Sequence, residues 1–458
     1  MTVKIQDMNH SGMTGDITFY PITGGSINLG SQLIPYYYTA PLVYGDYSVY
    51  FSGTEQTCTT SLLTDSLIVI GNSTVYGLVT FSISDEINNF NFEAYVDWGD
   101  GSPIEAYTGN YNYNFVHNYA VDGNYTVIVT FNDNTIPNYF EVDDEPSVET
   151  VINFPVLPNL TEIYIYANND LLSLDLRDCT NLQTVNLDSC EFLSSVLFGN
   201  NPSLNFIYVP DTIITDLDVS SLNNLVQLDC SQSQVINLNV SGCTNLGELY
   251  CQNNQITGLD LLNCSNLNLL FCNENQLTYL NVSGLTNLNT IDCYINQLTT
   301  LNLSGCTLLQ SLDCSTNQLN SLYVSSDSAL LSDLYCNDNQ LTDLNLSGFT
   351  SLSTLYCDTN QLTNLNISGC TSLVGLYTGN NQLTSLYLDS FNIFDIRCSF
   401  NYLPITIINQ ILVHLNSETT NYGQADLDGQ TPPAPPSGAG ITAKTNLQTV
   451  KFWTVNTD

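Results

Sequence analysis

Residues 267–308 read LNLLFCNENQLTYLNVSGLTN and then LNTIDCYINQLTTLNLSGCTL, which are two 21-residue units in the same phase. Leucines, one cysteine and an Asn-Gln-Leu triplet recur at the same positions in both units. Such units, spaced by 21 residues with a single step of 22, begin at Leu225, Leu246, Leu267, Leu288, Leu309, Leu331, Leu352 and Leu373, and looser copies begin at Leu160, Leu182, Leu204 and Ile393. A short fixed period over half of a chain predicts a solenoid, here of about twelve coils.

Each unit holds two short segments that alternate apolar and polar residues as strands do, for example Leu249-Tyr250-Cys251 and Leu259-Asp260-Leu261. The turns between them carry Asn-Gln and Ser-Gly, and 21 residues leave no room for a proper helix. A single coil cannot bury its own leucines, so the coils must stack as parallel strands about 4.8 Å apart. A positive φ is expected at one recurring turn, which holds Gly242, Gly284, Gly305, Gly348 and Gly369.

Two columns of identical residues are expected to support this stack. Inward asparagines would satisfy turn backbone groups that burial would otherwise leave unpaired: Asn254, Asn275, Asn296, Asn317, Asn339, Asn360, Asn381 and Asn401. Cysteine replaces a core leucine as a small apolar residue at Cys230, Cys251, Cys272, Cys293, Cys314, Cys336, Cys357 and Cys398. Their Cβ atoms would lie about 4.8 Å apart, beyond the roughly 3.5–4.5 Å of a disulfide, so we expect mostly free thiols and synthesis in a reducing compartment.

The repeats resemble the leucine-rich-repeat superfamily, in particular the short 21-residue bacterial type called IRREKO, with the form LxxLxCxxNxLxxLDLxx. The resemblance covers residues 160–403, over half of the chain. It implies a binding or structural role and no shared chemistry.

Residues 63–146 read as strands and turns, and three motifs stand out: Val96-Asp97-Trp98-Gly99-Asp100-Gly101, then His117-Asn118-Tyr119, then the segment from Gly123 to Thr130. They resemble a PKD-type immunoglobulin-like domain, although Trp-Gly-Asp-Gly lacks the residue that the family often has after Trp. The resemblance implies a β-sandwich that serves as a spacer or adhesion module.

The expected architecture is mainly β, with four parts. Residues 1–62 form a small β-rich attachment domain, 63–146 the PKD-like sandwich, 147–403 the leucine-rich-repeat solenoid and 404–458 a C-terminal cap. In the cap, residues 405–417 predict an amphipathic helix with Ile405, Ile408, Ile411, Leu412 and Leu415 on one face, followed by a Pro-rich loop and a strand at 450–455. Such an end covers the core of the last coil.

Charge narrows the classes of function. The chain has 44 acidic residues and only five Lys or Arg (Lys4, Arg177, Arg397, Lys444 and Lys451), for a net charge of −39. Nucleic-acid binding needs cations to neutralise phosphates, and docking on anionic lipid needs them too, so neither partner is expected. The first residues lack a basic start followed by an apolar run, and no stretch of 18 apolar residues predicts a transmembrane helix.

One outward column is the candidate binding site. The position before the cysteine reads Tyr164, Asn186, Tyr208, Asp229, Tyr250, Phe271, Asp292, Asp313, Tyr335, Tyr356, Tyr377 and Arg397; we call it the aromatic–acidic column. Exposed aromatic rings suit sugar stacking or a protein hot spot. Tyrosine is also common on strands for cross-strand packing alone, and the sequence leaves these readings open.

Acidic pairs suggest two further readings. Asp292 and Asp313 would lie about 5 Å apart, near the carboxylate spacing of a retaining glycosidase, but no cleft is indicated. Like-charged neighbours also arise in cation sites or as tolerated surface pairs. Asp97 and Asp100 are candidates for Ca²⁺, although Gly-Asp-Gly is first of all a turn. No Walker loop, GxSxG, HExxH or CxxC motif occurs. We therefore expect that the chain is not an enzyme and that it binds no cofactor, with Ca²⁺ as the one candidate ion.

The leading interpretation is a virion structural or adhesion protein, such as a phage fibre, spike or capsid decoration, made in the host cytoplasm. The N-terminal domain would attach to virion proteins, and the solenoid would contact a glycan or protein of the host surface. A homo-oligomer is compatible with the sequence. The alternatives are a secreted or cell-surface bacterial adhesin and a polysaccharide-degrading enzyme.

Overall fold

The computed structural model describes residues 2–5, 14–21, 27–33, 36–39, 47–51, 54–55, 67–71, 77–84, 91–110, 112–120, 126–131, 139–142, 152–153, 160–169, 171–325, 328–388, 393–418 and 421–458. The chain divides into two compact units. One contains Met1–Phe140 and Ser147–Leu160, and the other contains Glu141–Pro146 and Thr161–Asp458. We expected the solenoid to begin at residue 147, whereas the long segment of the unit that contains it begins at Thr161.

The N-terminal unit is built from antiparallel strands. They are β1 (Thr2–Ile5), β2 (Thr14–Pro21), β3 (Ile27–Leu33), β4 (Tyr36–Thr39), β5 (Tyr47–Phe51), β6 (Thr54–Glu55), β7 (Leu67–Gly71), β8 (Gly77–Ser84), β9 (Asn91–Asp97), β10 (Glu105–Asn110), β11 (Asn112–Tyr119), β12 (Thr126–Phe131), β13 (Tyr139–Val142) and β14 (Ile152–Asn153). Strand β2 pairs with β3 and β5, while β9, β12, β7 and β14 pair in that order. The PKD-like sandwich and the separate domain at 1–62 stay predictions.

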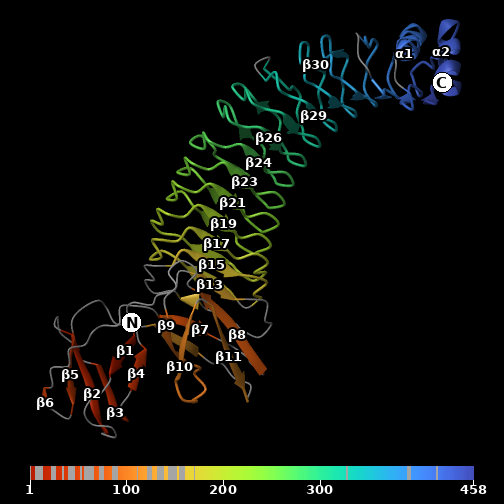
Figure 1. The fold of residues 1–458 in the computed structure, drawn as a ribbon. Helices are drawn as coiled ribbons and strands as arrows, with labels where there is room; N and C mark the ends of the chain where they lie inside the picture. Colours follow the sequence, from red (N-terminus) through yellow and green to blue (C-terminus); the bar gives the residue numbers. More distant parts are fainter. Residues whose placement is uncertain are drawn as a thin grey trace. The chain divides into compact units, whose positions relative to one another are not determined.

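The second unit is a parallel β-solenoid whose coils stack in chain order (Figure 1). Its main sheet takes one strand from each coil: β15 (Glu162–Ile165), β17 (Thr184–Asn186), β19 (Phe206–Tyr208), β21 (Gln227–Asp229), β23 (Glu248–Tyr250), β24 (Leu269–Phe271), β26 (Thr290–Asp292), β28 (Ser311–Asp313), β29 (Asp333–Tyr335), β31 (Thr354–Tyr356), β33 (Gly375–Tyr377) and β34 (Asp395–Arg397). Neighbours pair in parallel without a register shift, as the repeat predicted.

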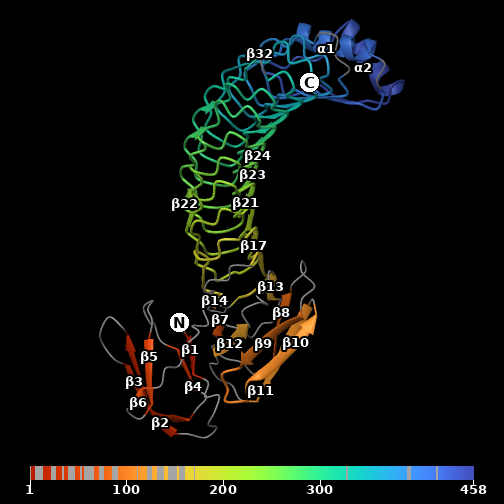
Figure 2. The ribbon, with the colours of Figure 1, turned by 60° about the vertical axis from the view of Figure 1, so that its left-hand side comes forward.

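A second row of strands lies on the other side of the coils (Figure 2). It is interrupted, and it consists of β16 (Ser173–Asp175) with β18 (Ser195–Leu197), β20 (Asp216–Asp218) with β22 (Asn237–Asn239), β25 (Leu280–Asn281) with β27 (Leu301–Asn302), and β30 (Asp343–Asn345) with β32 (Asn364–Asn366). The expected strand at Leu259-Asp260-Leu261 is not formed. The alternation nevertheless holds there, because Leu259 and Leu261 are buried and Asp260 is exposed.

Leucine and cysteine fill the interior. Nearly all repeat leucines are buried, and so are the 14 cysteines of the described residues, none of which forms a disulfide. Burial raises the pKa of thiols such as Cys272 well above the usual value, so they are protonated and unreactive. A second cysteine set has a polar role that the sequence did not reveal, because Cys243 Sγ donates to the Val219 carbonyl at 3.2 Å and Cys306 Sγ to that of Val282 at 3.2 Å.

The turns hold two kinds of backbone constraint. Gly284, Gly305, Gly348 and Gly369 have positive φ, as expected, but the expectation is wrong for Gly242. A Cβ atom on Gly242 would lie 1.8 Å from the Ser220 carbonyl oxygen, so close backbone approach, rather than φ, requires glycine there. A left-handed non-glycine residue also recurs once per coil, from Ala167 (φ 48°) to Phe400 (φ 57°), and from Asn253 onward it directly precedes the asparagine column. The sequence did not indicate this backbone conformation.

The cap extends the solenoid. Helix α1 (Ile405–Ser417) buries Ile407, Ile408, Ile411, Leu412 and Leu415, so the apolar face is rotated from the predicted one and Ile405 is exposed. A second helix, α2 (Ala439–Thr449), was not predicted, because its apolar pattern is confined to Ala443 and Leu447. Strands β35 (Gln424–Asp426) and β36 (Thr454–Asn456) continue the main sheet beyond β34. No helix in the described part is long and apolar enough to cross a membrane.

Candidate functional site

The aromatic–acidic column is a continuous row on the outer surface of the main sheet. The middle residue of a typical strand is buried, as in β23 and β29, and the column residue that follows it points outward. In-register pairing places Tyr250 beside Phe271, and Asp313 beside Tyr335. Beyond Arg397 the row continues with Asp426 and Asn456 of the cap, which the sequence did not place there.

Aromatic side chains of the column stack on one another in two groups. The rings of Tyr250 and Phe271 are stacked with centroids 5.2 Å apart. Tyr335, Tyr356 and Tyr377 form the second group, with centroid distances of 5.0 and 3.9 Å. Tyr208 stands apart from both groups, between Asn186 and Asp229, and its hydroxyl donates to Gln227 Oε1 at 3.1 Å. The column therefore contains two short aromatic stacks rather than one uninterrupted stripe.

The tightest stack depends on Gly375. A Cβ atom at this position would lie 3.2 Å from Tyr377 Cε2, so the missing side chain gives the ring room to lie close to the sheet. The Tyr377 hydroxyl then donates to Asp395 Oδ2 on the next coil at 2.7 Å. Burial and this hydrogen bond raise the pKa of Tyr377 far above its ordinary value, so the phenol stays a hydrogen-bond donor.

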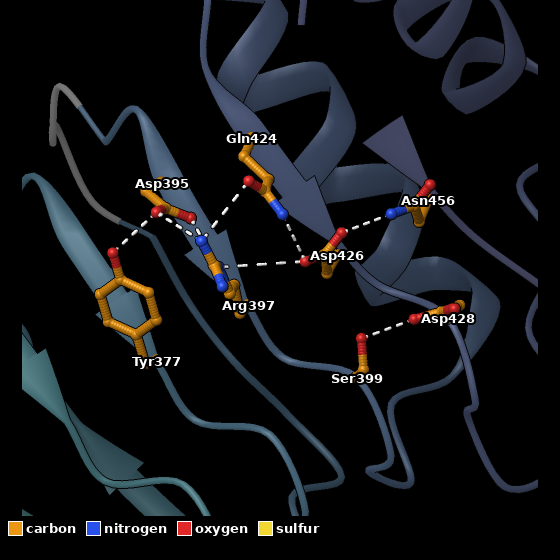
Figure 3. Close-up of polar contacts among 8 residues, drawn as sticks. All are labelled: Tyr377, Asp395, Arg397, Ser399, Gln424, Asp426, Asp428 and Asn456. Carbon is orange, nitrogen blue, oxygen red and sulfur yellow. Dashed lines mark hydrogen bonds and ion pairs between the residues drawn. The ribbon is translucent and has the colours of Figure 1, made fainter. Parts of the chain in front are cut away.

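Arg397 ends the second stack with a guanidinium. Its Cζ atom lies 5.2 Å from the centre of the Tyr377 ring, and its Nε and Nη2 atoms donate to the two oxygens of Asp395, each at 3.2 Å. Gln424 and Asp426 are the next polar neighbours (Figure 3). One arginine on this surface thus combines a ring-face contact with bidentate pairing to a carboxylate.

The acidic pair lies between the two stacks. Strands β26 and β28 place Asp292 directly beside Asp313, with Phe271 on one side and Tyr335 on the other. The Asp292 Oδ1 atom is buried and accepts no hydrogen bond from any described residue. Burial and the negative charge of Asp313 raise the pKa of Asp292 to about 7, against a smaller opposing effect of a backbone hydrogen bond from Tyr294. We call these two residues the acidic gap.

The asparagine column holds the strands that carry this surface. Asn317 is representative: its Nδ2 donates to the carbonyls of Cys293 and Cys314, at 3.0 and 3.2 Å, and its Oδ1 accepts from Leu298 N at 2.9 Å. Each asparagine therefore ties its own turn to that of the preceding coil. In the cap, Gln430 makes the equivalent contacts, donating to the Cys398 carbonyl and accepting from the Leu403 amide. The sequence could not show this, because Gln430 differs from the column in residue type and in its spacing from Asn401.

Two of the motifs noted between residues 96 and 130, the one around Trp98 and His117-Asn118-Tyr119, contact each other. The His117 ring stacks on the buried Trp98 with centroids 4.7 Å apart, and the Tyr119 hydroxyl donates to the Trp98 carbonyl at 2.7 Å. Asp97 and Asp100 accept backbone hydrogen bonds from Gly99 and Ser102, and His117 Nε2 lies 2.9 Å from Asp100 Oδ2. Burial by itself raises the pKa of Asp100, but hydrogen bonds from Ser102 and His117 outweigh it and lower the pKa to about 2. Both carboxylates thus shape the turn.

Within the described residues, no group of three or more His, Cys, Asp or Glu side chains is placed to hold a metal ion.

Comparisons with known proteins bear on the fold. No protein-family model and no curated protein sequence matches the chain. Among solved structures, an internalin (InlF) from Listeria monocytogenes aligns with a TM-score of 0.50 and 19% identity over 63% of this chain and 88% of that one. A domain of InlJ from the same species, described as including a cysteine ladder, aligns with a TM-score of 0.41 and 24% identity, covering 59% and 69% of the two chains. A leucine-rich-repeat protein of Leptospira interrogans aligns with a TM-score of 0.45 and 18% identity, over 66% of this chain and 90% of that one. The second unit is therefore a mainly β, parallel-strand solenoid whose structural neighbours are leucine-rich-repeat proteins, as the repeats predicted.

Proposed function

We propose that this chain is a non-enzymatic recognition protein that binds a protein partner through the aromatic–acidic column, between β23 and β34. The observation that carries the proposal is the row of stacked rings and carboxylates on a surface fixed by the asparagine column. Rigid aromatic side chains lose little conformational entropy on binding, which makes them effective anchors in protein interfaces.

The stacking geometry favours a protein over a glycan. A sugar ring needs the open face of an aromatic side chain. In the group of Tyr335, Tyr356 and Tyr377, neighbouring rings cover both faces of Tyr356 and one face of each outer ring, with centroids 3.9–5.0 Å apart, and Arg397 lies over the Tyr377 ring. Most of what this group offers is therefore ring edges, hydroxyls and carboxylates, which suit the side chains and backbone of a polypeptide, and the one open face, that of Tyr335, lies beside Asp313.

The experiment is selection of a displayed library of random 12-residue peptides on the full-length chain. The test variant replaces Tyr335, Tyr356 and Tyr377 by serine. The matched control replaces Tyr279, Tyr323 and Tyr387, which are 59%, 71% and 69% exposed and lie on the other side of the coils. Far-UV circular dichroism checks that both variants fold.

We expect selected peptides to bind the wild type and the control equally and to lose at least tenfold in affinity on the test variant. Equal binding to all three proteins would exclude the column as the site. A different outcome would be that no peptide depends on the column, while the wild type and the control bind a glycan on an array and the test variant does not. That outcome would indicate a sugar, rather than a protein, as the partner.

As the biological setting, we propose a virion appendage made in the host cytoplasm, attached through residues 1–62 and turning the column toward a host-surface protein. Free, buried thiols and the scarcity of Lys and Arg support this setting, and a secreted adhesin is the alternative. The test is the intact mass of natively produced protein, denatured with and without alkylation. Alkylation of nearly all 15 cysteines is expected, whereas several disulfides would favour export.

A further inference from the structure

We propose that the acidic gap is the specificity-determining part of this surface, and that it binds an arginine side chain of the partner between the rings of Phe271 and Tyr335. The inference rests on the proposed function, because it names the chemistry of the partner at that same site. The first argument is position. Asp292 and Asp313 interrupt the aromatic column on two successive coils, and a stack of rings ends on either side of them.

The second argument is the orientation of the flanking rings. Tyr250 covers one face of Phe271, and Tyr356 covers one face of Tyr335. Because stacked rings are nearly parallel, the opposite face of each is turned toward the gap. The interplanar angles are 14° and 18°. Phe271 and Tyr335 lie three coils apart, about 14 Å at the usual strand spacing. A planar cation seated on the two carboxylates would therefore meet one ring face at a time, that of Phe271 beside Asp292 or that of Tyr335 beside Asp313.

The third argument is charge. The sequence contains no Lys or Arg between Arg177 and Arg397, so no cation of the intervening coils can neutralise the gap. The Asp292 Oδ1 atom is buried and accepts no hydrogen bond from the described residues, so a partner would meet the half-exposed remainder of this carboxyl group. A guanidinium offers several donors in a fixed plane, and it would pair with both carboxylates at once.

The fourth argument is that the chain itself builds the same contact elsewhere on the column. Arg397 lies over the Tyr377 ring and forms two hydrogen bonds to Asp395, each 3.2 Å long (Figure 3). A ring on one coil and a carboxylate on the next are thus sufficient to hold a guanidinium on this sheet. The gap supplies the same two elements and leaves the cation to be supplied by the partner.

The test uses the full-length chain and the same library of 12-residue peptides. The test variant is Asp292→Asn with Asp313→Asn, which preserves side-chain shape. The control is Asp260→Asn with Asp343→Asn, two exposed acids outside the main sheet, so that both variants change the net charge equally. We expect arginine to be enriched in peptides selected on the wild type and on the control, and not in peptides selected on the test variant.

A synthetic copy of the most enriched peptide then gives the decisive comparison with its citrulline analogue, which keeps the shape of arginine and removes the charge. We expect citrulline to weaken binding about tenfold on the wild type and on the control, and to change it less than twofold on the test variant. Equal binding of the arginine and citrulline peptides to the wild type overturns the inference. If column-dependent peptides are selected without arginine, the protein-recognition function stands and the arginine site fails. If no column-dependent peptide is selected, both fail.

Discussion

The ring of Tyr356 lies flat on the ring of Tyr377, with centroids 3.9 Å apart and planes 4° from parallel. Neither residue alone defines this contact. It exists because β31 and β33 pair in register, because Gly375 leaves space beside the ring, and because Asp395 holds the Tyr377 hydroxyl. The candidate site is therefore a property of successive coils rather than of any single repeat.

Filling the space at Gly375 should disturb that contact. In Gly375→Ala, the new methyl group forces the Tyr377 ring away from its position, since the Cβ atom would lie 3.2 Å from Tyr377 Cε2. We expect a weaker near-UV circular dichroism signal of tyrosine with an unchanged far-UV spectrum. Gly247→Ala is the matched control, because its Cβ atom would only reach ordinary contact with the Val226 carbonyl at 3.6 Å. Identical near-UV spectra of the two variants would contradict the role given to Gly375.

Removing one asparagine of the column should destabilise the solenoid. Asn317→Ala leaves the buried Leu298 amide without its acceptor. It also removes one of two asparagine donors from each of the Cys293 and Cys314 carbonyls, which keep Asn296 and Asn339. One unsatisfied buried group costs about 1–3 kcal/mol, so we expect a loss of about that size in the free energy of unfolding. Urea titration followed by circular dichroism measures it. Gln318→Ala is the control, since this neighbouring side chain is exposed; equal midpoints for both variants would rule out the ladder role.

Relieving backbone strain at Ile295 should stabilise the protein. Ile295 adopts φ 49°, a left-handed conformation that β-branched residues rarely accept and asparagine tolerates. We expect Ile295→Asn to raise the free energy of unfolding by about 1 kcal/mol. The reciprocal change Asn253→Ile, at the equivalent position with φ 58°, should lower it by a similar amount. Thermal unfolding of both variants checks the prediction, which fails if their melting temperatures move in the same direction.

The acidic gap should make stability depend on pH near neutrality. Burial and the negative charge of Asp313 raise the pKa of Asp292 to about 7 in the folded chain, against an ordinary value of 3.8. Between these two values the folded state binds the proton more tightly, so stability falls as pH rises from 4 to 7 and this penalty is constant above it.

Asp292→Asn removes the penalty. We therefore expect this variant to exceed the wild type in urea midpoint at pH 8, and the excess to shrink as pH falls to 4. Asp260→Asn, which replaces an exposed carboxyl, should show no such trend. An Asp292→Asn difference that is constant across this range would refute the assignment.

Most of the fold could be predicted from the sequence because a solenoid repeats one local pattern. Leucine periodicity, the cysteine phase and the inward asparagines follow from the 21-residue unit, since each coil meets only its neighbours. The structure of the cap was harder to predict. Helix α2 has a short apolar pattern, and its Gly440 is required by contact with Asn409 of α1, where an added Cβ atom would lie 2.0 Å from the side-chain oxygen.

The sequence by itself thus determined the coil, its in-register stacking and which column of side chains faces outward. Tertiary structure decided what that column presents. Whether neighbouring rings show a face or an edge depends on side-chain torsions set across coils, as for Tyr356 and Tyr377, and how poorly Asp292 is satisfied depends on burial between strands. The same holds for Gly242, whose requirement comes from the Ser220 carbonyl of the preceding coil. Periodicity fixes which residues become neighbours, whereas only packing fixes the distance and orientation at which they meet.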